Sequence, residues 1–327
     1  MQLNQNEFVA NLMNVIVKFR LNDTASGRRI NDLLDATIVD ETKFGDSMAV
    51  ISVDTLNVKD YSETSSLLAV NKPVMDEQIL TTTDKKLIEV TINRYLMAGA
   101  FADEYALSEA IARIESMLEK TKNIYNYKKT VLAYQGWKPL DPDGQPVNQT
   151  TQVVTIDLVS TDGLKGTALK DTNTANALKI YETIREYALN MQAPSREYNE
   201  LKYEEMYNAD DMIFITNAKY DTLINTHAYA SLLNSDKLNN IKLYDKSIVV
   251  PNNQFTDSTT KQNTIGWLAS KFKYMISPRF ILVTSFLDGS TLNLNEFLHM
   301  WLISGFARGL GMIKFVANYV VAEQQTK

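Results

Sequence analysis

The stretch DEYALSEAIARIESMLEKTKNIYN, residues 103–126, decides how this chain is organised. Its apolar side chains recur at spacings of three and four residues, and its charged side chains fall between them. That period is typical of one long helix with a single buried face. Acidic residues stand at the start and lysines near the end, where the helix dipole favours each sign. At ~1.5 Å per residue the helix would be about 35 Å long.

Working outward toward the N-terminus, the residues before this helix read as strands. TIVDE (37–41), MAVISV (48–53) and QILTTT (78–83) are rich in alternating or β-branched residues. Between them lies a polar excursion, residues 55–77, which cannot bury its own apolar side chains and therefore needs a partner. Those side chains are Leu56, Val58, Leu67, Leu68 and Val70. Residues 84–98 show helical spacing and predict a further helix before the long one.

Toward the C-terminus, residues 128–134 and 151–160 read as two strands. Residues 161–176 read as a loop-rich crossing and a domain boundary. An α/β unit follows, with helices predicted at 177–192 and 218–234 and strands at 212–216, 241–251 and 263–270. The apolar residues 280–289 and 296–321 are expected to return to the core near the long helix.

Composition limits the class of protein. The 327 residues are 45% hydrophobic and 22% charged, which is typical of a globular protein of about two domains. No cysteine is present, so neither disulfides nor thiolate chemistry contribute. The net charge of -6 and the lack of long basic clusters argue against tight nucleic-acid binding. No segment has the ~20 apolar residues of a membrane span, and the N-terminus does not read as a signal peptide.

The sequence offers little catalytic chemistry. The two histidines, His227 and His299, lie in separate segments, so we expect no histidine metal site. Gly305, Gly309 and Gly311 do not match a phosphate-binding loop and predict close backbone packing instead. The segment Asp141-Pro-Asp-Gly144 reads as a turn rather than a calcium loop, and no catalytic, cofactor-binding or metal-binding residue is predicted.

The order of these parts resembles the major capsid protein of tailed bacteriophages, the Hong Kong 97 type of fold, particularly in small short-tailed phages. Residues 53–92, VDTLNVKDYSETSSLLAVNKPVMDEQILTTTDKKLIEVTI, are similar to an extended E-loop that descends into the helix preceding the spine. Residues 210–250 resemble the strand, helix and strand of an axial domain. Residues 296–317, EFLHMWLISGFARGLGMIKFVA, resemble the closing strands of a peripheral domain.

The resemblance implies an α+β fold with five parts. These are an N-terminal arm (1–36), the E-loop and its flanking strands (37–83), a peripheral (P) domain with a spine helix at about 103–126 (84–165), an axial (A) domain (166–290), and a return to the P domain (291–327). The amphipathic residues 7–20 of the arm would pack either in the core or on a neighbouring subunit.

The implied function is that of a non-enzymatic major capsid protein, which self-assembles as hexamers and pentamers into an icosahedral shell around double-stranded phage DNA. The implied partners are other copies of the chain, a separate scaffolding protein, a portal and DNA bound without sequence specificity. The expected location is the virion, with assembly in the host cytoplasm. The expected inter-subunit contacts are Leu56, Val58, Lys59, Tyr61, Leu67, Leu68, Phe8 and Phe19.

Three alternatives stay open at this point. One is an encapsulin-like shell with the same fold that packages a cargo enzyme. Another is an α/β enzyme whose site would use Asp210, Asp211 and Lys219. The third is another virion part, such as a portal or tail protein.

Overall fold

The computed structural model describes residues 31–39, 47–56, 58, 72–92, 104–146, 151–228, 242–254, 263–288 and 293–320. The chain divides into two compact units. The first comprises Met1–Met48, Ile79–Lys129 and Met275–Gly305, and the second comprises Ala49–Gln78, Thr130–Tyr274 and Phe306–Lys327. Four strands and the longest helix contain residues of both units.

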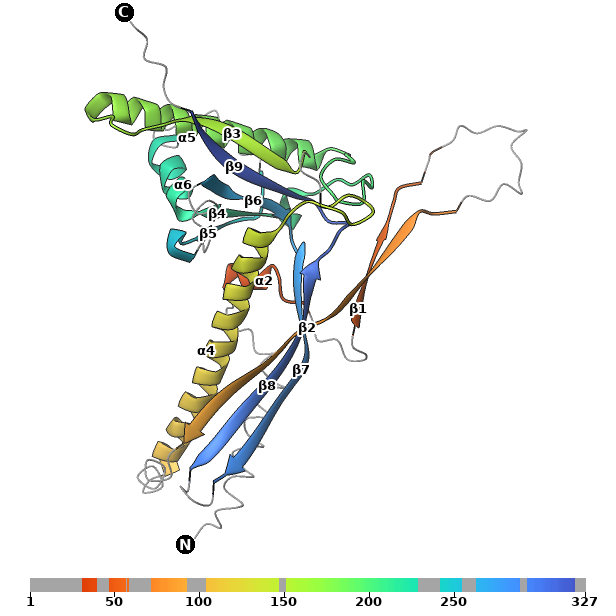
Figure 1. Ribbon diagram of the computed structural model, residues 1–327, viewed down its shortest axis with the longest axis vertical. Coiled ribbons are helices and arrows are strands. Elements are labelled where there is room, and N and C mark those ends of the chain that lie inside the picture. The colour runs from red at the N-terminus through yellow and green to blue at the C-terminus, as the bar shows by residue number, and fades with distance from the viewer. Residues whose placement is uncertain are drawn as a thin grey trace, which may run out of the picture. The chain divides into compact units, whose positions relative to one another are not determined.

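A four-stranded sheet has the order β1-β2-β8-β7 (Figure 1). Its strands are β1 (Ser47–Val53), β2 (Met75–Ile92), β7 (Tyr274–Leu287) and β8 (Leu294–Phe306). Strand β2 runs antiparallel to β8, with Lys86 opposite Met300 and Ile88 opposite Leu298. Leu298, Met300 and Leu302 alternate along β8 and are buried, which identifies the inward face of the sheet.

The longest helix, α4 (Glu104–Gly136), packs beside β2 in the first unit. The Tyr125 hydroxyl donates to Asp84 Oδ2 at 3.1 Å, and Lys129 pairs with the same carboxylate. Short helix α2 (Asp32–Asp35) precedes a backbone bridge between Ile38 and Ile276 on β7. These contacts attach the helix and the chain before β1 to the sheet.

The second unit is built on a five-stranded sheet of order β3-β9-β6-β4-β5. Its strands are β3 (Val153–Val159), β4 (Met212–Asn217), β5 (Lys246–Val250), β6 (Thr264–Ser270) and β9 (Met312–Val320). Pairs β3/β9 and β4/β5 are parallel, whereas β6 is antiparallel to both of its neighbours. Helices α5 (Gly166–Gln192) and α6 (Ala218–Leu223) and turns η1 (Ala209–Asp211), η2 (Ile224–Ala228) and η3 (Asn252–Gln254) complete the unit.

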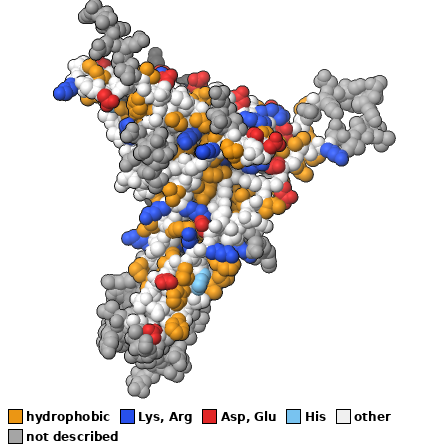
Figure 2. Space-filling view, in the orientation of Figure 1, with side chains coloured by type: hydrophobic (Ala, Val, Ile, Leu, Met, Phe, Trp, Pro, Cys, Tyr) orange, Lys and Arg blue, Asp and Glu red, His pale blue; other side chains and the backbone are white. Residues whose placement is uncertain are grey.

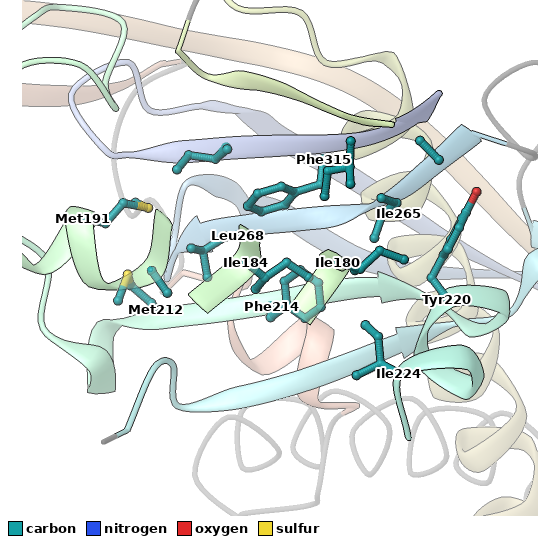
Figure 3. Close-up of a cluster of buried hydrophobic side chains, with 14 of the residues drawn as sticks. Ile180, Ile184, Met191, Met212, Phe214, Tyr220, Ile224, Ile265, Leu268 and Phe315 are labelled. Atoms are coloured by element: carbon teal, nitrogen blue, oxygen red, sulfur yellow. The ribbon is translucent and has the colours of Figure 1, made fainter. Parts of the chain in front are cut away.

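Both faces of this sheet are covered. On one face, Ile180, Ile184 and Met191 of α5 pack against Phe214, Leu268 and Phe315 (Figure 3). On the other face, the Tyr134 ring, from the end of α4, lies 5.9 Å from the ring of Trp267. This double coverage explains why β4 and β6 are continuous buried runs.

Most of the predicted elements are present. The strands at 48–53, 151–160, 212–216 and 263–270 are confirmed with small shifts of their ends, and the strand at 78–83 is part of β2. The long helix is confirmed but ends ten residues later, the helix at 177–192 is confirmed but begins eleven residues earlier, and the strand predicted at 241–251 begins only at Lys246. The helix predicted at 218–234 is α6 followed by a π turn, and residues 229–234 lie outside the described residues. The strand predicted at 37–41 makes only the bridge at Ile38, and residues 40–41 are not described.

Three predictions are wrong. Of the helix predicted at 84–98, residues 84–92 are strand, because pairing with β8 decides their conformation, and residues 93–98 lie outside the described residues. Residues 128–134 continue α4, since Thr130, Val131 and Tyr134 are buried at helical spacing. Residues 166–176 form the first turns of α5, where polar, mostly exposed side chains leave no apolar period to detect.

Candidate inter-subunit surface

A two-stranded ribbon carries exposed apolar side chains, of which Leu56 is one that the sequence analysis singled out. The ribbon is defined here as residues 49–56 and 72–78, from β1 and the start of β2. The backbone N–H of Asp54 donates to the carbonyl of Val74 at 2.9 Å and closes the described part of the ribbon. Burial alternates along β1, so successive side chains point to opposite faces.

One face of the ribbon is apolar and open. Ile51 is 66% exposed and Met75 62% exposed, and Val53 is also exposed. Leu56 and Val58, just beyond the strand, are 65% and 99% exposed. Figure 2 shows hydrophobic side chains on the surface of the ribbon and charged side chains gathered next to it. Exposed apolar side chains grouped in this way mark an interaction surface.

The other face of the ribbon is polar. It is hydrogen-bonded to other residues of the second unit, to which the ribbon belongs. The Asp54 carboxylate accepts from the backbone N–H of Glu204 at 3.0 Å and from Arg196 Nη1 at 2.9 Å. These bonds, the first of them above all, lower the pKa of Asp54. The Gln78 side chain donates to the carbonyl of Phe306 at 2.8 Å and accepts from the Arg308 N–H at 3.0 Å.

A buried charged group lies behind these contacts. Lys273 is fully buried, and its Nζ donates to Glu200 Oε1 at 3.2 Å and to the carbonyls of Ala307 and Leu310 at 2.9 Å each. Trp137 Nε1 also donates to Glu200 Oε1, at 3.2 Å. Burial lowers the pKa of Lys273, and the Glu200 carboxylate opposes that change. The sequence analysis missed this group, because its members are distant in sequence and match no motif.

Two of the predicted contact residues, Leu56 and Val58, lie exposed as a contact surface requires. The other six lie outside the described residues: Lys59, Tyr61, Leu67, Leu68, Phe8 and Phe19. Sequence reasoning did not assign the apolar face of the strands themselves. The alternation of Ile51 and Val53 was visible but was read only as strand, and Met75 was read as part of the polar excursion.

The residues of the enzyme alternative do not converge. Asp210 and Asp211 lie in η1 immediately before β4, and Lys219 lies immediately after it, so six strand residues, about 20 Å, separate them. Asp210 pairs with Lys242, and Lys219 Nζ donates to the Tyr319 hydroxyl at 3.1 Å. Each of these side chains takes part in a local contact rather than a shared site.

The histidines and glycines have structural contacts. His299 Nε2 lies 3.1 Å from Thr284 Oγ1, and His227 Nδ1 lies 3.5 Å from Thr174 Oγ1. A Cβ on Gly305 would come within 2.6 Å of Leu80, and one on Gly311 within 2.8 Å of Tyr207. The prediction of close packing at the glycines is confirmed. In the described part of the chain, no three acidic or histidine side chains group as a metal site, and no helix is long and apolar enough to cross a membrane.

Comparison with known proteins decides the family. A family model described as Phi29-like phage major capsid protein matches residues 1–315 of the chain. The chain belongs to this family. It is therefore a major capsid protein, a structural component of phage capsids, as the resemblance implied. No curated protein sequence matches this capsid protein.

Solved structures show the same fold at low identity. The capsid structure of Staphylococcus phage Andhra is 14% identical, with a TM-score of 0.57 over 89% of this chain and 84% of that one. The capsid of cyanophage P-SCSP1u is 12% identical, with a TM-score of 0.57 over 90% of each chain. The capsid of Ralstonia phage GP4 is 10% identical, with a TM-score of 0.53 over 92% and 94%. The predicted α+β phage-capsid fold is confirmed, and the enzyme and encapsulin alternatives are not favoured.

Proposed function

We propose that this capsid protein assembles as hexamers and pentamers into an icosahedral shell that encloses double-stranded phage DNA, and that the ribbon contacts a neighbouring subunit. The observation that carries the proposal is the open apolar face of the ribbon, continued by Leu56 and Val58. Burial of apolar area stabilises association by roughly 25 cal/mol per Å². Covering this water-exposed face with a second copy of the chain would therefore lower the free energy of the assembled state.

A closed shell contains many copies of one modest inter-subunit contact. Closed symmetry repeats the same interface many times, so each subunit is held by several partners at high effective concentration. Leu56, Val58, Lys59, Tyr61, Leu67 and Leu68 would supply the contact at the end of the ribbon, and Phe8 and Phe19 a contact from the N-terminal arm. The arm and the far end of the ribbon enter this proposal on their sequence alone.

The domain assignment is also a proposal. The first unit, with the spine helix and strands β2, β7 and β8, fits the expected P domain. The second unit, with its covered five-stranded sheet, fits the expected A domain, and the ribbon fits the E-loop. The boundaries expected from the sequence divide that sheet, since β3 and β9 fall within the segments expected in the P domain.

The remaining partners follow from the same function. A net charge of -6 suits a shell that confines DNA without binding it tightly. A separate scaffolding protein and a portal would act with the chain during assembly in the host cytoplasm. Catalysis has no part in the proposal.

Deletion of residues 62–71 tests the contact. We expect the deleted chain to keep the circular dichroism spectrum of the parent, because the described ribbon and both sheets lie outside the deletion. We also expect it to form no closed particles in electron microscopy, alone or with scaffolding proteins of the same genome. The parent chain is the control. Normal shells from the deletion variant would refute the role of the projection, and a parent that stays monomeric under every condition would refute shell assembly itself.

A further inference from the structure

The ribbon would be loose if it depended on its own hydrogen bonds. An isolated two-stranded ribbon is marginally stable in water and twists strongly. Among the strands that the structure describes, β1 also lies at the edge of its sheet, next to β2. The direction of the ribbon must therefore be set by contacts with other parts of the second unit.

Two separate loops make such contacts with the polar face. At one point, the Gln78 amide bonds to the backbone on both sides of Ala307, through the Phe306 carbonyl and the Arg308 N–H. At the other point, Asp54 accepts from the Glu204 N–H and from Arg196, and the Thr55 hydroxyl donates to Glu204 Oε2 at 3.2 Å. We call these two groups of bonds the polar anchor.

A steric contact lies between the two points. A Cβ added to Gly309 would collide with Ser52 Oγ and would lie 2.7 Å from Ser52 Cβ. The turn that holds Gln78 therefore lies directly against the neighbouring strand β1. Both strands of the ribbon are thus held from the same polar side.

Both loops are themselves fixed to the core. The turn at residues 307–311 is held by buried Lys273, which bonds to the carbonyls of Ala307 and Leu310, and by Arg308 Nη2, which donates to the Asp141 carbonyl at 2.7 Å. The other loop is closed by a backbone bridge between Ser195 and Glu205. The carbonyl of Tyr198 accepts from the Met312 N–H at 3.0 Å, which ties this loop to β9.

We propose that Gln78, Asp54 and Arg196 are positioning residues that fix the direction of the ribbon in the free subunit, so that its apolar face is already aimed at a second copy of the chain before assembly. The statement that the apolar face is aimed at a second copy of the chain rests on the proposed function. The statement that the three residues fix the direction of the ribbon concerns the free subunit alone. Preorganisation of this kind increases affinity because less conformational freedom is lost when the partner binds.

The direction of the ribbon can be measured in solution. The chain has no cysteine, so spin labels on Met75→Cys and Asp171→Cys report the distance between the ribbon and α5 within one unit. Both positions are exposed. We expect one narrow distance distribution in the labelled parent. Gln78→Leu removes both bonds of one point of the anchor, and Arg196→Leu removes the Arg196 bonds from the other point. In each variant we expect a distribution at least twice as wide.

Two further variants separate positioning from general damage. Gln78→Glu keeps the acceptor for the Arg308 N–H but not the donor to Phe306, so its distribution should be intermediate. Glu77→Gln changes the neighbouring exposed side chain and should leave the distribution as in the parent. Because Arg196 is half exposed, Arg196→Leu keeps a folded subunit available if Gln78→Leu does not fold.

Assembly is measured on the same variants without labels, as the lowest protein concentration that yields particles in light scattering. Loss of one anchor point should raise this concentration roughly fivefold, the effect of about one hydrogen bond. Unchanged distance distributions in both leucine variants would overturn the anchor, whether or not shells form. Wider distributions with an unchanged assembly concentration would overturn the positioning role. A parent with a narrow distribution and no shells would contradict the proposed function but not the anchor.

Discussion

At the scale of single residues, Lys273 shows how a buried charge can organise a surface feature. Its three hydrogen bonds go to Glu200 and to two carbonyls of the turn before β9. Removing one partner of such a buried pair typically costs about 3–5 kcal/mol, because the other charge stays buried and unpaired. The same turn bonds to Gln78 of the ribbon, so this lysine supports the ribbon without touching it.

A second charged residue predicts how stability depends on pH. Hydrogen bonds from Lys271, at 2.7 Å, and Lys242, at 3.1 Å, lower the pKa of Asp245 to about 2. The folded-state pKa is below the unfolded value of about 3.9, so the contribution of Asp245 is complete above about pH 4 and is lost as the pH falls through about 2. We therefore expect the urea midpoint of the parent to fall more steeply between pH 5 and pH 2 than that of Asp245→Asn.

The control for this pH prediction is Asp171→Asn, an exposed carboxylate on α5. Its urea midpoint should follow that of the parent across the same range. Parallel curves for the parent and Asp245→Asn would contradict the assigned role of the two lysines.

At the scale of elements, helix α4 contains one buried leucine and one exposed leucine that can be compared directly. Leu118 is 2% exposed and Leu132 is 51% exposed. Leu118→Ala should lower the free energy of unfolding by about 2–5 kcal/mol, because it leaves a cavity. Leu132→Ala should change it by about 0.5 kcal/mol or less. Urea denaturation followed by circular dichroism measures both, and equal losses would show that the buried face of α4 has been assigned incorrectly.

The elements also show what sequence patterns can and cannot predict. Buried strands such as β4 were recognisable because a short apolar run ends in turn residues on both sides. Residues 84–92 were misread because Leu87, Ile88 and Thr91 fit helical spacing while Ile88 and Val90 also fit strand alternation. Only the pairing of these residues with β8, two hundred positions later in the chain, decides between the two.

The candidate surface likewise has one part that the sequence predicts and one part that it does not. The need for a partner at Leu56 and Val58 follows from apolar residues inside a polar segment, which is local information. The polar anchor depends on Asp54 meeting a loop about 150 positions away and Gln78 meeting a turn about 230 positions away. No periodicity or motif contains such pairings, so this half of the site required the fold.

At the scale of the whole molecule, the apolar nature of the open ribbon face predicts that cold weakens assembly. Hydrophobic association loses strength on cooling, whereas contacts between charged groups do not share this dependence. We expect the lowest concentration that yields particles to be several-fold higher at 5 °C than at 30 °C. Light scattering at fixed ionic strength measures it, and Val58→Asp should raise the concentration further at both temperatures. A lower threshold in the cold would show that polar contacts dominate.

The continuity of β2 has a mechanical consequence. The strand runs without a break from Met75, in the ribbon, to Ile92, and ten of its residues pair with β8. A pull on the ribbon along the strand axis would load the hydrogen bonds between β2 and β8 together, in shear, and would not break them one after another. In the shell proposed above, tension in a wall filled with DNA would reach β8 through this strand, and the ribbon would carry load between subunits.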